Sequence, residues 1–117
     1  MEQVKSEIGS NRKTMSIPMS AEFVNYLSKG IEREGRFSRT EAFLDLVKRQ
    51  QIIIDQTGEP NIAGSARDFA KLWKWDRDAV SNFLRKLNSL GVLSISSSGF
   101  DTSYSITCTI NDQESSD

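Results

Sequence analysis

The sequence predicts an α+β fold that is mainly α-helical, and the strongest indication lies in residues 65–110. Three observations support this prediction. A short segment with a helix-capping residue comes first, a longer amphipathic segment that ends at a glycine follows, and two alternating segments joined by a Ser-Gly stretch come last. Helical periodicity predicts two helices, and period-two alternation predicts two strands. We therefore expect a helix pair followed by a β-hairpin.

Composition bounds the class of protein before any element is placed. The chain has 117 residues, of which 37% are hydrophobic and 26% charged, and this is enough for one soluble domain with a modest core. No apolar run approaches the ~20 residues of a membrane span. We expect the domain at residues 14–110, between a disordered N-terminal arm at 1–13 and a disordered acidic tail at 111–117, because both ends are polar and unpatterned.

The absence of histidine and the single cysteine restrict the chemistry. Ser-His and Cys-His nucleophile pairs are impossible, and a zinc site of ordinary composition is excluded. A lone cysteine and the lack of a secretory signal fit a cytoplasmic location. We expect no enzymatic activity and no cofactor.

Residues 14–35 predict a short strand and a helix. Residues 14–19 alternate between apolar and polar side chains, although Pro18 cannot donate to a sheet. Ser20 is a suitable N-cap, and we expect Gly35 to end the helix. The apolar face at helical spacing consists of Phe23, Tyr26, Leu27 and Ile31.

The next helix is predicted to begin after Ser38. Ser38 and Glu41 have the spacing of a capping box, in which each side chain bonds the backbone amide of the other residue. Its apolar face consists of Ala42, Phe43, Leu44, Leu46 and Val47. Residues 50–55 could extend this helix or form a strand, because periodicity cannot decide so short a stretch. After a turn, residues 61–63 predict a short strand that pairs with the later hairpin.

Residues 65–76 predict a short helix and a tight turn. Ser65 is the expected N-cap, with Asp68 at the position that completes a capping box. The expected buried side chains are Phe69, Ala70, Leu72 and Trp73. Residues 73–76 form the turn, and Asp76 is the expected N-cap of the following helix.

That following helix has one apolar and one polar side. The apolar stripe expected to face the core is Val80, Phe83, Leu84, Leu87 and Leu90. Gly91 is expected to end the helix in the left-handed conformation. The polar side consists of Arg77, Asp78, Ser81, Asn82, Arg85 and Lys86. Such side chains read base edges or hold phosphates.

Residues 92–110 predict the hairpin. The first strand begins at Val92, residues 96–101 form a flexible tip, and the second strand alternates so that one face is buried. The buried face is expected to contain Tyr104, Ile106, Cys108 and Ile110. We interpret Cys108 as an inert buried residue. Two helices, a hairpin and this order of elements are typical of a winged helix-turn-helix with an N-terminal helical extension and a C-terminal two-stranded wing.

The segments FSRTEAFLDLV and GSARDFAKLWKWDRDAVSNFLRKLNSLGVL carry a resemblance to a known family. They resemble the winged-helix domains of phage and mobile-element replication proteins, which have an SREEA-like first helix and a W-x-W turn before the recognition helix. The match covers residues 37–110. It implies double-stranded DNA binding in replication initiation or in the regulation of mobile DNA. Trp73 and Trp75 in the turn could stack on bases, but we favour a structural role in the core.

Charge is distributed unevenly along the chain. The net charge is −1, but residues 65–90 contain six basic and three acidic residues, and residues 111–117 contain three acidic residues and no basic one. A locally basic helix pair can bind phosphates because counterion release is a local effect. The residues expected to contact DNA are Arg77, Asp78, Ser81, Asn82, Arg85, Lys86, Lys71, Lys74 and Arg67.

Three functional hypotheses follow. The preferred one is sequence-specific binding of double-stranded DNA by a transcriptional regulator or replication accessory of a mobile element or phage, with a second copy of the chain or a replication or regulatory protein as further partners. In the second, residues 13–49 form a dimeric ribbon-helix-helix in which Lys13, Thr14 and Ser16 face DNA. The third is a winged helix used for protein–protein assembly, since the total charge is nearly neutral and the wing tip has no Lys or Arg.

Overall fold

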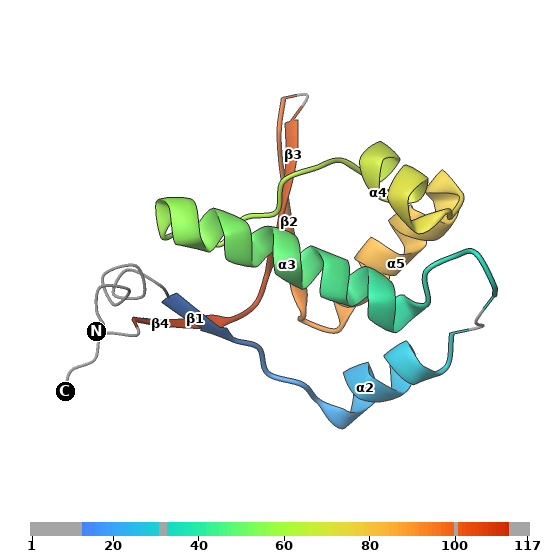
Figure 1. Cartoon of the computed structure of the whole chain (residues 1–117), viewed down its shortest axis with the longest axis horizontal. Coiled ribbons are helices and arrows are strands. Elements are labelled where there is room, and N and C mark those ends of the chain that lie inside the picture. The colour runs from blue at the N-terminus through green and yellow to red at the C-terminus, as the bar shows by residue number, and fades with distance from the viewer. Residues whose placement is uncertain (1–12, 31–32, 100, 113–117) are drawn as a thin grey trace, which may run out of the picture.

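The computed structural model describes residues 13–30, 33–99 and 101–112. They form an α+β arrangement of four helices and two small antiparallel sheets (Figure 1), and the predicted α+β class is confirmed. The elements are β1 (Lys13–Ser16), α2 (Ala21–Ser28), α3 (Arg39–Thr57), α4 (Ala66–Trp73), α5 (Arg77–Ser89), β2 (Leu93–Ser98), β3 (Asp101–Ile106) and β4 (Thr109–Asp112). Within these residues no helix has the length and apolar character needed to cross a bilayer.

Helix α3 runs through the middle of the molecule, between α2 and the α4–α5 pair (Figure 1). The predicted capping box begins it: the Glu41 amide donates to Ser38 Oγ at 3.1 Å, and the Ser38 amide donates to Glu41 Oε1 at 2.8 Å. The helix continues to Thr57, so residues 50–55 are helical. Gln50 and Ile54 are fully buried and extend the face that Leu46 begins, and this burial favours helix over strand here.

Helix α2 is shorter than the sequence predicts. Ser20 caps it as expected, because its side chain accepts from the Phe23 amide at 3.1 Å. The expected end at Gly35 is wrong, since the helix ends at Ser28 with Lys29 as its C-cap. Gly30 follows directly, and glycine in a helix costs roughly 1 kcal/mol relative to alanine. Ile31, which the sequence places on the apolar face, lies outside the described residues.

Helices α4 and α5 have the predicted start and stop signals. Ser65 and Asp68 form a complete capping box at the start of α4. Lys74 takes the left-handed conformation with φ 62° and makes the tight turn, and Gly91 does so with φ 78° after α5. Asp76 occupies the N-cap position of α5 as expected, but its side chain makes no capping hydrogen bond.

Leu44 and Leu72, both expected in the core, are instead exposed, and the expected core residues that are only partly buried are Tyr26, Val47, Leu90, Cys108 and Ile110. Leu44 is 52% exposed and Leu72 is 44% exposed. Both lie outside the buried arc of their helices, since the residues around them that turn inward are Ala42, Phe43, Phe69 and Trp73. Cys108 is half-buried rather than buried, and burial raises the pKa of its thiol.

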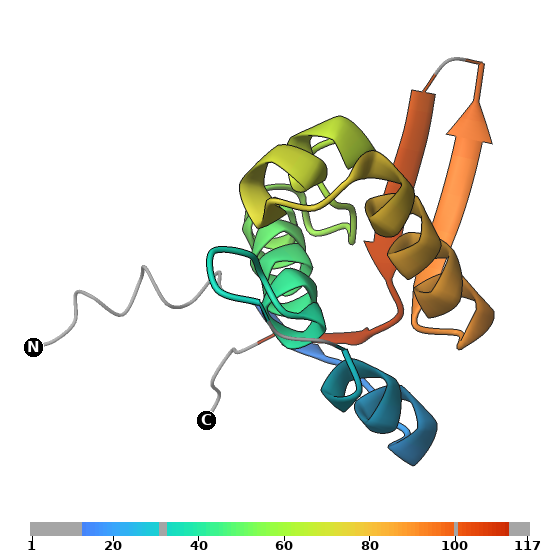
Figure 2. The same ribbon diagram turned by 90° about the vertical axis from the view of Figure 1, so that its right-hand side faces the viewer.

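The hairpin of β2 and β3 projects away from the helices (Figure 2). Its pairing runs from Leu93 with Ile106 to Ser98 with Asp101, so the expected flexible tip at 96–101 is wrong except around Gly99. Residues 96–98 and 101 belong to the strands because their backbone groups pair across the hairpin. The expected short strand at 61–63 is present as a single bridge, in which the Ile62 amide donates to the Tyr104 carbonyl at 2.9 Å.

The sequence predicts one continuous strand up to Ile110, and the structure contradicts this. The strand breaks after Ile106, and residues 109–112 form β4, which pairs with β1 in a second sheet. Lys13 pairs with Asp112, so residues 13, 111 and 112, which the sequence places in the arm and the tail, belong to this sheet. The rest of the expected arm and tail, residues 1–12 and 113–117, lies outside the described residues.

Aromatic rings fill the core between α3, α4 and α5. Trp73 is fully buried, stacks on Phe69 with ring centroids 5.1 Å apart, and meets Phe83 edge-on at 5.8 Å. A ring without exposed surface cannot stack on a base, so the structural interpretation of Trp73 is confirmed. Trp75 is only partly buried against the same cluster.

Candidate nucleic-acid interface

The position of α5 follows from its apolar stripe. Val80, Phe83, Leu84 and Leu87 are each at most 3% exposed, and Leu90 packs partly against the same cluster. The predicted core-facing side of this helix is therefore confirmed. The opposite side must face solvent because the helix has a single buried stripe.

Two contacts define the flanks of the exposed side. Asn88 Nδ2 donates to the Leu93 carbonyl at 2.8 Å, which orients one flank toward β2. Lys86 Nζ lies 5.7 Å from the centre of the Tyr26 ring, which orients the other flank toward α2. At about 100° of rotation per residue, the centre of the exposed side then consists of Asp78, Asn82 and Arg85.

The sequence-predicted residues of α5 divide accordingly. Arg77, Asp78, Asn82, Arg85 and Lys86 are exposed, whereas Ser81 is half-buried. Among the described residues, the side chains of Asp78, Asn82 and Arg85 make no hydrogen bond or ion pair. These polar groups are therefore free to bind a ligand.

The other three predicted residues lie off this helix. Arg67 and Lys71 are exposed on α4, and Lys74 is exposed in the left-handed turn. No hydrogen bond or ion pair in the described part of the chain joins them to α5. They lie on the preceding helix and in its turn, and not on the α5 face.

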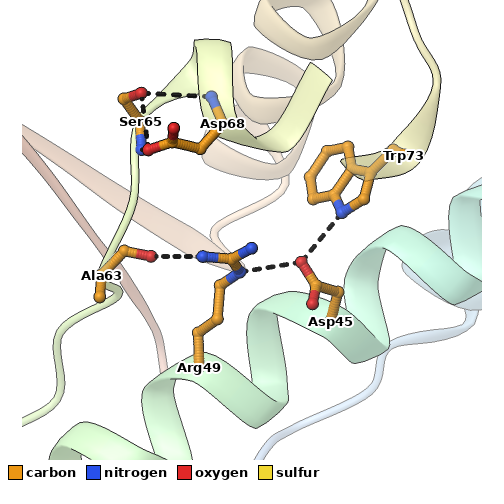
Figure 3. A network of polar contacts seen from close by, with 6 residues as sticks. All are labelled: Asp45, Arg49, Ala63, Ser65, Asp68 and Trp73. Carbon is orange, nitrogen blue, oxygen red and sulfur yellow. Dashed lines mark hydrogen bonds and ion pairs between the residues drawn. The ribbon is translucent and has the colours of Figure 1, made fainter. Parts of the chain in front are cut away.

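A polar network attaches α4 to α3 and so positions the helix pair (Figure 3). Asp45 Oδ2 accepts from Trp73 Nε1 and from Arg49 Nε, both at 2.9 Å. Arg49 also donates to the Ala63 carbonyl at 2.9 Å, which holds the segment that precedes α4. This network is not among the predictions made from the sequence. The signal was the acid–base pair at positions i and i+4.

A second missed feature is a cleft of about 330 Å³ between α5 and the loop that joins α2 to α3. Only Asn82 of the predicted residues lines it. The remaining lining residues are Tyr26, Gly30, Arg33, Arg36, Phe37, Arg39, Trp75, Ala79 and Phe83. The sequence signal was an arginine at every third position from 33 to 39 in a glycine-containing linker.

The described residues contain no group of three or more His, Cys, Asp or Glu side chains that could hold a metal ion. No protein-family model matches this chain, and neither a curated protein nor a solved structure matches it. The chemistry of the exposed side chains is therefore the basis for assigning a function.

Proposed function

We propose that the protein binds double-stranded DNA sequence-specifically, with the exposed side of α5 in the major groove. One observation carries this proposal: α5 buries its apolar stripe while Asp78, Asn82 and Arg85 project outward without partners among the described residues. Arginine bonds guanine, asparagine bonds adenine, and a carboxylate accepts from the cytosine amino group. Three different readers on one helix face suit sequence discrimination better than general phosphate attraction.

The order of elements supports the same proposal. The order of elements matches that of a winged helix-turn-helix: α3, the Ile62 bridge, α4, the tight turn, α5 and the β2–β3 hairpin. In this comparison β1 and α2 are an N-terminal extension. In such folds the second helix of the pair enters the major groove. A role as a transcriptional regulator or replication accessory of a mobile element or phage remains our hypothesis from the sequence resemblance.

The pairing of β1 weighs against a ribbon-helix-helix dimer. That arrangement requires the strand at 13–16 to pair with its counterpart in a second copy. All four residues of β1 instead pair with β4 of the same chain. The hypothesis that Lys13, Thr14 and Ser16 face DNA therefore has less support than the α5 face.

One observation favours protein–protein assembly as a second candidate function. The strands of the hairpin, residues 93–98 and 101–106, contain no Lys or Arg, and Ile95 on β2 is 37% exposed. Such a hairpin supplies no cation for a DNA phosphate. Salt dependence separates the two functions, because DNA binding weakens steeply with salt whereas apolar assembly does not.

The test begins with selection of a bound sequence from random duplexes. Arg85→Ala should then weaken specific binding by about 1–3 kcal/mol if Arg85 contacts a base, and leave non-specific binding nearly unchanged. Lys71→Ala should weaken both kinds of binding and lower the salt slope by roughly one unit. Lys48→Ala, which removes an exposed charge on α3, is the control.

Two outcomes would replace the proposal. If α5 variants bind like the parent while changes at Lys13 or Thr14 abolish binding, the ribbon-helix-helix dimer is the better description. If no duplex is retained even at low salt, the protein does not bind DNA and assembly takes its place.

A further inference from the structure

The cleft beside α5 is lined by three arginines, and no ion pair within the described part of the chain neutralises their charges. Arg33, Arg36 and Arg39 line it, and none of the described residues that line it is Asp or Glu. A neighbouring hollow is lined by Glu34 and Glu41 together with Arg33 and Arg36, and no ion pair joins these described side chains. Within the described residues, neither Arg33 nor Arg36 has an ion pair. Three cationic groups around one cleft repel each other unless an anion lies between them.

The third arginine is held in place by α2. Arg39 donates to the Tyr26 carbonyl at 2.6 Å, and its guanidinium lies 3.9 Å from the centre of the Tyr26 ring. A guanidinium has five N–H donors, so most of them remain available to a ligand. Burial raises the pKa of Tyr26, against a smaller opposing effect of Arg39. The Tyr26 hydroxyl therefore stays neutral at physiological pH and does not compete as an anion.

Gly30 allows this placement of Arg39. A Cβ atom at Gly30 would lie 2.8 Å from Arg39 Cγ and 2.9 Å from Cδ. The arginine stem thus packs directly on the glycine backbone. A side chain at position 30 must therefore move Arg39. An uncharged substitution there displaces this arginine without changing the number of charges in the cleft.

The opposite wall is aromatic and fixed to the α4–α5 turn. The Phe37 amide donates to the Trp73 carbonyl at 3.0 Å, and Trp75 Nε1 donates to the Phe37 carbonyl at 2.8 Å. The Trp75 ring packs edge-on against Phe83, with centroids 5.2 Å apart. These contacts hold the loop close to the start of α5. A half-buried indole beside a group of guanidiniums is a suitable surface for a sugar or base that carries a phosphate.

We propose that this cleft binds the phosphate group of a nucleotide. Guanidinium groups match phosphate oxygens with paired N–H donors, and the aromatic wall adjoins the rest of the nucleotide. The phosphate comes either from the backbone of a duplex on α5 or from a free nucleotide. The first source rests on the proposed function, and Asn82 connects the two surfaces because it lies both in the cleft and at the centre of the exposed side of α5.

Trp75 provides the readout, since its indole lines the cleft whereas Trp73 is fully buried. The full chain is titrated with deoxyadenosine monophosphate, with inorganic phosphate and with duplex DNA, and tryptophan fluorescence is followed. Arg36→Gln removes one cleft charge. Lys48→Gln removes one exposed charge outside the cleft and is the matched control. Gly30→Ala displaces Arg39 at constant charge, and circular dichroism verifies the fold of each variant.

If the cleft binds a phosphate of the DNA backbone, Arg36→Gln should weaken binding of every duplex alike by about tenfold. It should also lower the salt slope of binding by roughly one unit. If the cleft binds a free nucleotide, deoxyadenosine monophosphate should change the tryptophan fluorescence of the parent. Arg36→Gln and Gly30→Ala should each lower the affinity for this nucleotide by about tenfold or more. Inorganic phosphate should compete with the nucleotide. Lys48→Gln should behave like the parent in both arms.

The proposal is overturned if folded Arg36→Gln and Gly30→Ala proteins match Lys48→Gln with all three probes. Failure of the proposed function gives a different result. If Arg85→Ala binds duplexes like the parent while Arg36→Gln loses the mononucleotide, the cleft is a nucleotide site and the α5 assignment is wrong. If Arg85→Ala loses specific binding while Arg36→Gln binds every probe like the parent, the α5 assignment is correct and the cleft is not a phosphate site.

Discussion

The side-chain amide of Gln50 pairs with the backbone of Ile106 as a neighbouring strand would. The Ile106 amide donates to Gln50 Oε1 at 2.7 Å, and Gln50 Nε2 donates to the Ile106 carbonyl at 3.0 Å. Gln50 is fully buried on α3, and Ile106 is the last residue of β3. These two bonds satisfy the amide and the carbonyl of Ile106, where the chain passes from the β2–β3 sheet to the β1–β4 sheet. Buried backbone groups require such hydrogen-bond partners.

Gln50→Leu should therefore destabilise the protein strongly. Both backbone groups of Ile106 would lose a buried partner, at about 2–5 kcal/mol in total. Urea unfolding measures the loss, and Gln56→Leu on the exposed side of the same helix is the control, expected within about 0.5 kcal/mol of the parent. A loss below ~1 kcal/mol for Gln50→Leu would mean that water or a rearranged backbone replaces the amide.

Phe83→Ala should cost about 3–5 kcal/mol. Phe83 is 2% exposed, and its ring meets the rings of Trp73 and Trp75 edge-on. The substitution leaves a cavity at the contact between α4 and α5. Arg85 lies two residues later in the chain, on the exposed side of α5. The urea midpoint of Arg85→Ala should therefore nearly equal that of the parent. Similar midpoints for the two variants would show that α5 faces the core with another side.

Asp45→Ala should lower both stability and duplex affinity. Trp73 Nε1 is buried and would lose its acceptor, at a cost of about 1–3 kcal/mol, and Arg49 would lose its ion pair. The network holds α4, and through it α5, against α3. Asp55→Ala, which removes an exposed carboxylate of the same helix, should leave unfolding and gel shifts nearly unchanged. Unchanged stability of Asp45→Ala would exclude a structural role of this carboxylate.

The capping box of α4 should make stability depend on acid pH. Hydrogen bonds from the Ser65 backbone amide, and then from its hydroxyl, lower the pKa of Asp68 below its ordinary value of 3.8. A lowered folded pKa means that the stabilisation is complete above the ordinary value and is lost as the pH falls through the folded value. NMR titration of the carboxyl carbon measures this pKa directly.

Ser65→Ala removes the hydroxyl but keeps the backbone amide, so the pKa of Asp68 should rise part of the way toward its ordinary value. Ser28→Ala, at the end of α2, should leave it unchanged. An Asp68 that titrates at or above its ordinary value in the parent protein would show that the capping box does not persist in solution.

Features that depend on neighbours along the chain could be predicted from the amino-acid sequence. The capping residues Ser20, Ser38 and Ser65, the left-handed Gly91 and the buried stripe of α5 were all predicted correctly. Each rests on a hydrogen bond or a periodicity that spans only a few residues. For the candidate site, this locality identified the polar residues that α5 exposes.

Features that depend on distant partners required the three-dimensional structure. Residues 50–55 are helical where Gln50 and Ile54 are buried, and the Gln50 amide there pairs with Ile106, 56 residues later in the chain. The last strand divides after Ile106 because β4 pairs with β1 at the other end of the chain. The arginine-lined cleft forms because hydrogen bonds hold Phe37 against the α4–α5 turn. Propensity and periodicity act over a few residues, whereas these arrangements depend on which distant backbone groups find partners.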